Sequence, residues 1–201
     1  MTAAIVQGPR ALRLIEANHG TWRGWVRCLL GEAEYLTGRL DTWLAPPPAT
    51  VQRLVFVCLG NINRSAFAAA VAQSMGVDTV SIGLSTTTGA PANPVALHCA
   101  QRHGVDLGAH RATDITDHQP RPGDLLLVME VRHARRLVAA GFASNSIALL
   151  GHWASPHRIH LHDPHGLSDA YFATCFTLIE SAVRNLVAAR RGQLPMGEAR
   201  R

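Results

Sequence analysis

The stretch from residue 53 to residue 75 most strongly constrains the fold of this chain. The apolar run 54–57 is typical of a buried strand and ends at Cys58, and a helix-forming segment begins at Ser65. The loop between them holds Leu59, Gly60, Asn61, Ile62 and Asn63, and Arg64 follows it. A strand that passes through a short loop into a helix N-terminus presents several backbone N–H groups without intrahelical partners. We therefore expect an anion site at the carboxyl end of this strand.

The residue types in this loop indicate phosphoryl chemistry. The helix dipole and the backbone amides favour a thiolate over a thiol at Cys58. Arg64 suits a tetrahedral dianion because its planar fork donates two parallel hydrogen bonds. Ser65 is expected to hydrogen-bond the thiolate and also to cap the helix. An inert, buried cysteine at a strand end is the alternative, but the thiol, the five-residue loop and the arginine together favour Cys58 as a nucleophile.

The rest of the chain alternates between strand and helix patterns, which is typical of a parallel sheet covered on both faces. Further strands are expected at 79–82, 124–129 and 146–150, and helices at 93–104, 131–140 and 168–191. Asn93 and Ser168 are the expected N-caps of the first and last of these helices. The sequence therefore predicts an α/β three-layer sandwich with a central four-stranded parallel sheet. We assign it to residues 51–192, with a flexible tail at 193–201.

Residues 1–50 are expected to form an N-terminal helical extension and a Pro-rich linker. Apolar residues recur at three- and four-residue steps from Trp22 to Leu44 and predict one helix of about six turns. Thr21 is its expected N-cap, and the proline run at 46–48 is expected to end it. The apolar stripe, with three of the four tryptophans, is expected to be buried. Three roles are open: packing on the following domain, self-association or protein docking, and membrane-surface binding, which nearby acidic residues disfavour.

The motif Cys-x5-Arg-Ser, with a loop that reads Leu-Gly-Asn-Ile, resembles the low-molecular-weight protein tyrosine phosphatase family. Val57 precedes the cysteine, where the larger tyrosine phosphatases typically place histidine. The resemblance implies that the amides of residues 59–64 and the Arg64 side chain bind phosphate, with no cofactor and no metal. It implies that Asp163, in the turn with Pro164, is the general acid and then the general base. It also implies that His110 supports the loop through Asn61.

Shorter segments refine this resemblance. Residues 128–130 and 149–153 resemble the bacterial branch linked to exopolysaccharide export, whose substrate is a membrane tyrosine autokinase. A phosphotyrosine protein is therefore the expected partner. Asn63 stands where family members commonly carry a second cysteine, so Cys58 should lack reversible disulfide protection. His165 and Leu167 stand where aromatic residues often clasp the substrate ring, so tyrosine selectivity is less secure than phosphatase chemistry.

The charge, the cysteines and the histidines of the chain indicate which partners, which location and which metal sites to expect. The formal net charge is +5, and its arginines are scattered rather than gathered in a basic patch with aromatic residues, so no nucleic-acid partner is expected. The four cysteines match no zinc or disulfide framework, which indicates a reducing, cytoplasmic location. Five histidines lie near Asp163 in the sequence, and we expect them to form a solvated, pH-responsive loop rather than a metal site; they are His152, His157, His160, His162 and His165.

The predicted function is hydrolysis of phosphotyrosine and other aryl phosphate monoesters through a cysteinyl-phosphate, independent of metal. Two alternatives remain. Arsenate reduction needs additional cysteines near the loop, and residues 63–95 contain none. A non-catalytic phosphotyrosine-binding or regulatory module has no need of the thiol of Cys58 or the carboxyl of Asp163.

Overall fold

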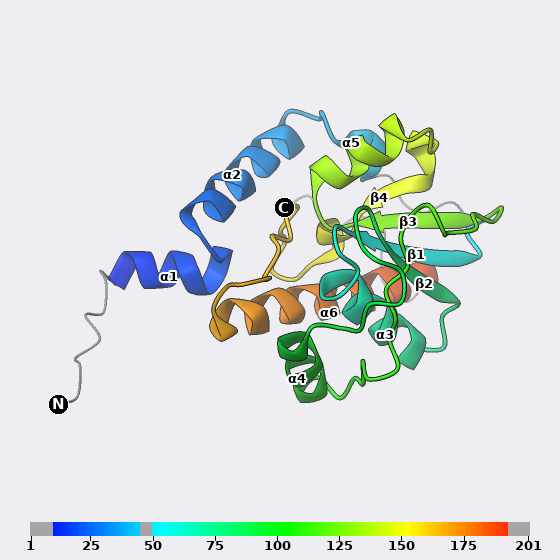
Figure 1. The fold of residues 1–201 in the computed structure, drawn as a ribbon. Coiled ribbons are helices and arrows are strands. Elements are labelled where there is room, and N and C mark those ends of the chain that lie inside the picture. Colours follow the sequence, from blue (N-terminus) through cyan, green and yellow to red (C-terminus); the bar gives the residue numbers. More distant parts are fainter. Residues whose placement is uncertain (1–9, 45–49, 193–201) are drawn as a thin grey trace.

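Four parallel strands form one sheet at the centre of the molecule (Figure 1). The computed structural model describes residues 10–44 and 50–192. Its strands are β1 (Arg53–Cys58), β2 (Thr79–Gly83), β3 (Asp124–Val128) and β4 (Ile147–Leu149), in the order β2-β1-β3-β4. The two central strands, β1 and β3, are almost entirely apolar because both of their faces are covered. The predicted four-stranded parallel sheet is confirmed.

Helices cover both faces of this sheet. Helices α3 (Arg64–Ser74), α4 (Pro94–Arg102) and α6 (Asp169–Arg190) pack on one face, where Phe67 stacks on Phe176 at a ring-centroid distance of 4.1 Å. Helix α5 (Val131–Ala139) packs on the other. Helix α6 is long and apolar enough to cross a membrane by length and composition, but half of its apolar window is buried inside this fold. The three-layer prediction is confirmed.

The predicted N-caps begin their helices as expected. The side-chain oxygen of Thr21 accepts a hydrogen bond from Gly24 N at 2.9 Å, that of Asn93 from Val95 N at 2.9 Å, and that of Ser168 from Tyr171 N at 3.3 Å. Each cap satisfies a backbone N–H that the first helical turn leaves without a partner.

The N-terminal extension differs from the single long helix that we expected. It contains α1 (Arg10–His19), α2 (Trp22–Leu36) and a 3-10 turn, η1 (Asp41–Trp43). Helix α2 ends at Leu36 because Gly38 takes a left-handed conformation, with φ of +72°. The proline run that was expected to end the helix lies outside the described residues, as does the predicted tail at 193–201.

The face that α2 buries is also not the expected one. Trp22 is 61% exposed and Leu36 is 82% exposed, so the predicted burial of the whole apolar stripe is wrong. The buried residues of α2 are Gly24 and Gly31, whose missing side chains let the helix lie close to the domain. Downstream of α2, the side chain of Leu40 is fully buried in the core on the α5 side of the sheet.

Candidate active site

Cys58 ends β1, and its sulfur faces the start of α3. Its Sγ lies 3.0 Å from Ser65 Oγ and accepts a hydrogen bond from Asn61 N at 3.2 Å. Helix α3 begins at Arg64, with Asn63 in the N-cap position, so Ser65 lies inside the first turn. The expected Ser65–thiol contact is therefore present, whereas the expected capping role of Ser65 is wrong because its hydroxyl points back to the thiol.

Asn61 holds the loop in its shape. Its backbone is left-handed, with φ of 51°, which is costly unless the surroundings stabilise it. Its Nδ2 donates to Ser65 Oγ and to Ser81 Oγ, both at 2.8 Å, and its Oδ1 accepts from Thr113 N at 2.9 Å. His110 Nε2 donates to the Asn61 carbonyl at 2.7 Å. The structure thus brings His110 to Asn61, with the backbone oxygen as the acceptor.

Arg64 is fully buried and its fork is shared between two carboxylates. Its Nη1 donates to Glu130 Oε1 at 2.6 Å and to the Leu161 carbonyl at 2.8 Å, and its Nη2 donates to Asp163 Oδ2 at 2.6 Å. Burial disfavours the guanidinium charge, but Asp163 and Glu130 outweigh that cost and keep the pKa of Arg64 above its ordinary value. Arg64 therefore connects the loop to the expected acid.

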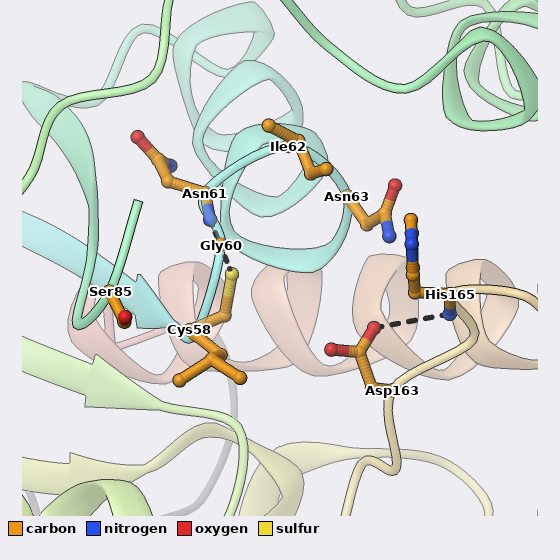
Figure 2. A pocket seen from close by; sticks show the side chains of 9 residues that line it. Cys58, Gly60, Asn61, Ile62, Asn63, Ser85, Asp163 and His165 are labelled. Atoms are coloured by element: carbon orange, nitrogen blue, oxygen red, sulfur yellow. Dashed lines mark hydrogen bonds between the residues drawn. The ribbon is translucent and has the colours of Figure 1, made fainter. Parts of the chain in front are cut away.

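A cavity of about 200 Å³ opens between the loop and Asp163 (Figure 2). Asp163 approaches it from the segment before α6, and its Oδ1 accepts a hydrogen bond from His165 N at 3.2 Å. Arg64 and His110 lie outside the cavity wall, which is lined by Cys58, Leu59, Gly60, Asn61, Ile62, Asn63, Ser85, Asp163 and His165. The structure thus places the predicted nucleophile, five predicted loop residues and the predicted acid around one space.

Several site residues were not predicted. Thr86 Oγ1 donates to the Gly60 carbonyl at 2.7 Å, and Ser85 and Ser81 belong to the same side of the site. Glu130, which binds Arg64, lies two residues after the end of the apolar strand β3. A charged residue at the carboxyl end of a central parallel strand was the available signal for this partner.

The histidines near Asp163 do not form the solvated loop that we expected. His157 and His165 are exposed, but His160 is only 7% exposed, and its ring lies 5.9 Å from the partly buried ring of His162. His160 Nε2 lies 3.3 Å from Glu130 Oε2. Burial lowers the pKa of His160 to about 4, so its imidazole is neutral at neutral pH. The prediction is wrong for His160 because residues 159–161 are covered by the fold.

The N-terminal extension contributes to this cover. Gly24 of α2 lies against the His162 ring, and a Cβ at Gly24 would come within 2.8 Å of His162 Cδ2. Glu32 Oε1 accepts a hydrogen bond from Ile159 N at 3.2 Å, and Thr174 Oγ1 donates to the Ala17 carbonyl at 2.8 Å. The extension thus supports the segment that leads into Asp163.

Comparison with known proteins agrees with this geometry. A model of the family "Low molecular weight phosphotyrosine protein phosphatase" matches residues 53–194, so the N-terminal extension lies outside it. The low molecular weight protein-tyrosine-phosphatase Wzb of Escherichia coli K12 is 34% identical over 139 residues, which cover 68% of this chain and 93% of Wzb.

Solved structures show the same relationship. The crystal structure of the Erwinia amylovora tyrosine phosphatase AmsI matches with a TM-score of 0.64 at 30% identity, covering 69% of this chain and 93% of AmsI. The tyrosine phosphatase Wzb of Escherichia coli K30, in complex with sulphate, matches with a TM-score of 0.59 at 27% identity, covering 67% of this chain and 94% of Wzb. The chain therefore belongs to the low molecular weight protein tyrosine phosphatase family, in its exopolysaccharide-type branch.

Proposed function

We propose that the chain hydrolyses phosphotyrosine in proteins through a cysteinyl-phosphate formed on Cys58. The observation that carries this proposal is the single cavity that Cys58 and Asp163 both line (Figure 2). A nucleophile and a carboxyl group on one phosphate-sized space can attack phosphorus and protonate the leaving oxygen in the same step. An enzyme needs both the Cys58 thiol and the Asp163 carboxyl at this cavity, whereas a module that only binds phosphotyrosine would need neither of them.

In the first step the Cys58 thiolate attacks phosphorus in line, and the bond from phosphorus to the tyrosine oxygen breaks. The loop amides stabilise the charge on the equatorial oxygens, as preorganised donors do in other acyl and phosphoryl transfers. Asp163 gives its proton to the departing phenolate. The Asn61 N–H that donates to Sγ stabilises the thiolate before attack.

Arg64 changes partners during this step. Its Nη2 is bonded to Asp163 Oδ2 at 2.6 Å, so an incoming phosphate dianion competes with Asp163 for the same N–H group. When phosphate takes the guanidinium, Asp163 Oδ2 becomes free to hold the proton that the leaving oxygen receives. Glu130 keeps the other side of the fork in place through Nη1.

The second step hydrolyses the cysteinyl-phosphate. Asp163, now ionised, takes a proton from water, whose oxygen attacks phosphorus while the sulfur–phosphorus bond breaks. Inorganic phosphate and the Cys58 thiolate are the products. Arg64 and the amides supply the positive charge that Mg²⁺ supplies in kinases.

The cavity wall favours an aryl substrate. Leu59 and Ile62 offer apolar side chains beside the thiol, and His165 offers a planar ring at the position where the resemblance expected an aromatic residue. Leu167, the other such position, packs against the core instead. Membership of the exopolysaccharide-type branch supports a tyrosine autokinase as the protein substrate. We also propose a reducing, cytoplasmic location, which the four free cysteines support.

The test is hydrolysis of an aryl phosphate and of a phosphotyrosine peptide by reduced enzyme in EDTA at mildly acidic pH. We expect Cys58→Ser to lose activity by on the order of 10⁴-fold or more, and Asp163→Asn by roughly 10²–10³-fold. Inactive wild type that still binds the peptide would overturn the proposal in favour of a binding module. Thiol-dependent arsenate reduction without ester hydrolysis would favour the reductase alternative.

A further inference from the structure

A group of side chains behind Arg64 has the composition of a metal site. Glu130, His160 and His162 each offer one ligand atom, and these three atoms lie within 4.8 Å of one another. Glu130 is fully buried at the end of β3, and both histidines come from the segment before Asp163. Two imidazoles and one carboxylate are a common ligand set for Zn²⁺, with a water in the fourth position.

The ligand atoms lack better partners within the fold. His160 Nε2 and His162 Nδ1 are buried and have no hydrogen-bond partner among the described residues. His160 Nε2 approaches Glu130 Oε2 to 3.3 Å, and Oε2 also makes no well-aligned hydrogen bond there. Buried polar atoms are normally satisfied, so two unpartnered imidazole nitrogens close to a buried carboxylate indicate room for a further ligand. The His160 and His162 rings lie side by side, with their centroids 5.9 Å apart and their planes at 21°.

The competing charges are on the two arginines that share Glu130. Arg64 Nη1 donates to Oε1 at 2.6 Å, and Arg132 Nη2 donates to the same oxygen at 2.9 Å, so an ion at Oε2 competes with Arg132 alone. Arg132 Nε lies 2.7 Å from Oε2, but the Arg132 side chain is half exposed and can turn into solvent. An ion at this site therefore displaces Arg132 and leaves the Arg64–Glu130 bond in place.

We propose that Glu130, His160 and His162 form an inhibitory site for a divalent transition metal such as Zn²⁺, one residue away from the catalytic acid. Ligands at ~2.0–2.1 Å from Zn²⁺ lie ~3.4 Å apart. Glu130 Oε2 and His160 Nε2 already lie 3.3 Å apart, whereas separations within the group reach up to 4.8 Å, so the closing movement falls mainly to His162. His162 directly precedes Asp163, and its movement toward Glu130 draws the acid away from the leaving oxygen. The ion also places positive charge near Arg64 and repels its guanidinium, although the bond from Arg64 Nη1 to Glu130 Oε1 stays in place. The inhibition rests on the proposed phosphatase activity, whereas the binding does not.

Binding is tested first in Cys58→Ser, because a thiolate at Cys58 is itself a zinc ligand. Titration of this variant with Zn²⁺ by calorimetry, and with Co²⁺ by visible absorption, is expected to show one site per chain with the strong absorption of a tetrahedral ion. Adding His162→Gln, or His160→Gln with His162→Gln, is expected to weaken binding at least 10-fold. His162 is only partly buried, so we expect His162→Gln to disturb the fold less than the double variant does. Thermal melting of each variant checks that it folds.

Matched variants separate this site from other histidines. His157→Gln changes an exposed histidine of the same segment and is expected to leave the affinity unchanged. Arg132→Ala removes the competitor for Oε2 and is expected to tighten binding several-fold. Binding that survives in the double histidine variant, or that is absent from Cys58→Ser, would overturn the site.

The inhibition is measured on enzyme with Cys58 intact. Zn²⁺ is expected to lower kcat at least 10-fold, EDTA to restore it, and His162→Gln to shift the half-inhibitory concentration upward at least 10-fold. If His162→Gln binds no metal in the Cys58→Ser background yet its active form is inhibited at the wild-type concentration, the ion acts at Cys58 and the inhibitory role is wrong. An enzyme that is inactive in EDTA would instead count against the proposed phosphatase function.

Discussion

The phosphate loop and the histidine cluster behind it use polar groups in opposite ways. In the loop, Asn61 makes hydrogen bonds to Ser65, Ser81 and Thr113 through its side chain, and its carbonyl accepts from His110. In the cluster formed by Glu130, His133, His160 and His162, several buried nitrogen atoms have no partner among the described residues. Arg64 connects the two regions, because it follows the loop in the chain and its Nη1 donates to Glu130 of the cluster.

This difference has a physical meaning. The hydrogen bonds of Asn61 hold the loop in a shape that can receive a tetrahedral anion without reorganisation. Asn63 Oδ1 is the exception in the loop, a buried oxygen without a partner among the described residues. A buried nitrogen without a hydrogen-bond partner lowers the stability of the fold. Proteins usually keep such groups where a ligand or a function requires them. The loop is therefore suited to bind the phosphate of the substrate. The cluster keeps buried nitrogen atoms that a further ligand could bind.

The largest expected effect lies on the loop side. Arg64→Lys keeps the charge but loses the planar fork that reaches Glu130 and Asp163 together. We expect kcat to fall by roughly 10²–10³-fold, as for the loss of one transition-state donor. The matched control is Arg132→Lys, which changes the half-exposed arginine on the same Glu130 and should leave kcat within a few fold. A kcat for Arg64→Lys within a few fold of the wild-type value in steady-state kinetics would show that charge alone is needed.

A smaller effect is expected from the cluster as the pH falls. Burial lowers the pKa of His160 to about 4 and that of His133 to about 3, against an unfolded value near 6.5. The unfolded chain therefore binds protons below pH 6.5 that the folded chain refuses, so stability is fully present above pH 6.5 and is lost as the pH falls toward 4. For His160 the loss is at most about 3 kcal/mol. Glu130, 3.3 Å from His160, titrates only below this window because Arg64 holds its pKa well below the ordinary value, although burial opposes this.

Thermal melts between pH 7.5 and 4.5 measure this dependence. His160→Gln should flatten the decline of Tm with falling pH, because glutamine cannot take up the proton. His98→Gln, at an exposed position of α4, serves as the control and should decline as the wild type does. Parallel declines for all three proteins would show that the cluster does not control the acid sensitivity.

The smallest effects are expected where α2 covers the cluster. A Cβ at Gly24 would lie 2.2 Å from the His19 carbonyl oxygen and 2.8 Å from His162 Cδ2, so Gly24→Ala must move backbone. We expect a loss of about 1–3 kcal/mol in unfolding free energy and a several-fold lower kcat, since His162 leads into Asp163. Gly31→Ala is the matched control, because its Cβ would lie 3.7 Å from Ile159 Cγ2, an ordinary contact. The two variants are compared by chemical denaturation, and equal stabilities would mean that α2 does not press on the acid segment.

Local sequence determined the catalytic loop and the alternation of strands and helices. Features that depend on neighbours within a few residues can be predicted from the sequence pattern. They are the apolar run before Cys58, the Asp163–Pro164 turn, and the capping residues Thr21, Asn93 and Ser168. The rule that ligands bind at the carboxyl ends of parallel strands placed Cys58 at the site, whereas Asp163 was assigned to it through the resemblance of its Asp-Pro turn to the family's acid loop.

Tertiary structure alone decided the rest. Helix α2 carries an apolar stripe that predicts burial of its tryptophans, but the contact with the domain runs through Gly24 and Gly31, because close approach of two backbones requires small residues rather than apolar ones. Glu130 and His160 are 30 residues apart, and only the crossing of β3 with the segment before α6 places them 3.3 Å from each other. The sequence by itself thus determined the sheet and predicted Cys58 as the nucleophile, and its family resemblance predicted Asp163 as the acid. The partners of Arg64 and the burial of the histidines depend on long-range packing, because the residues involved are distant in the sequence.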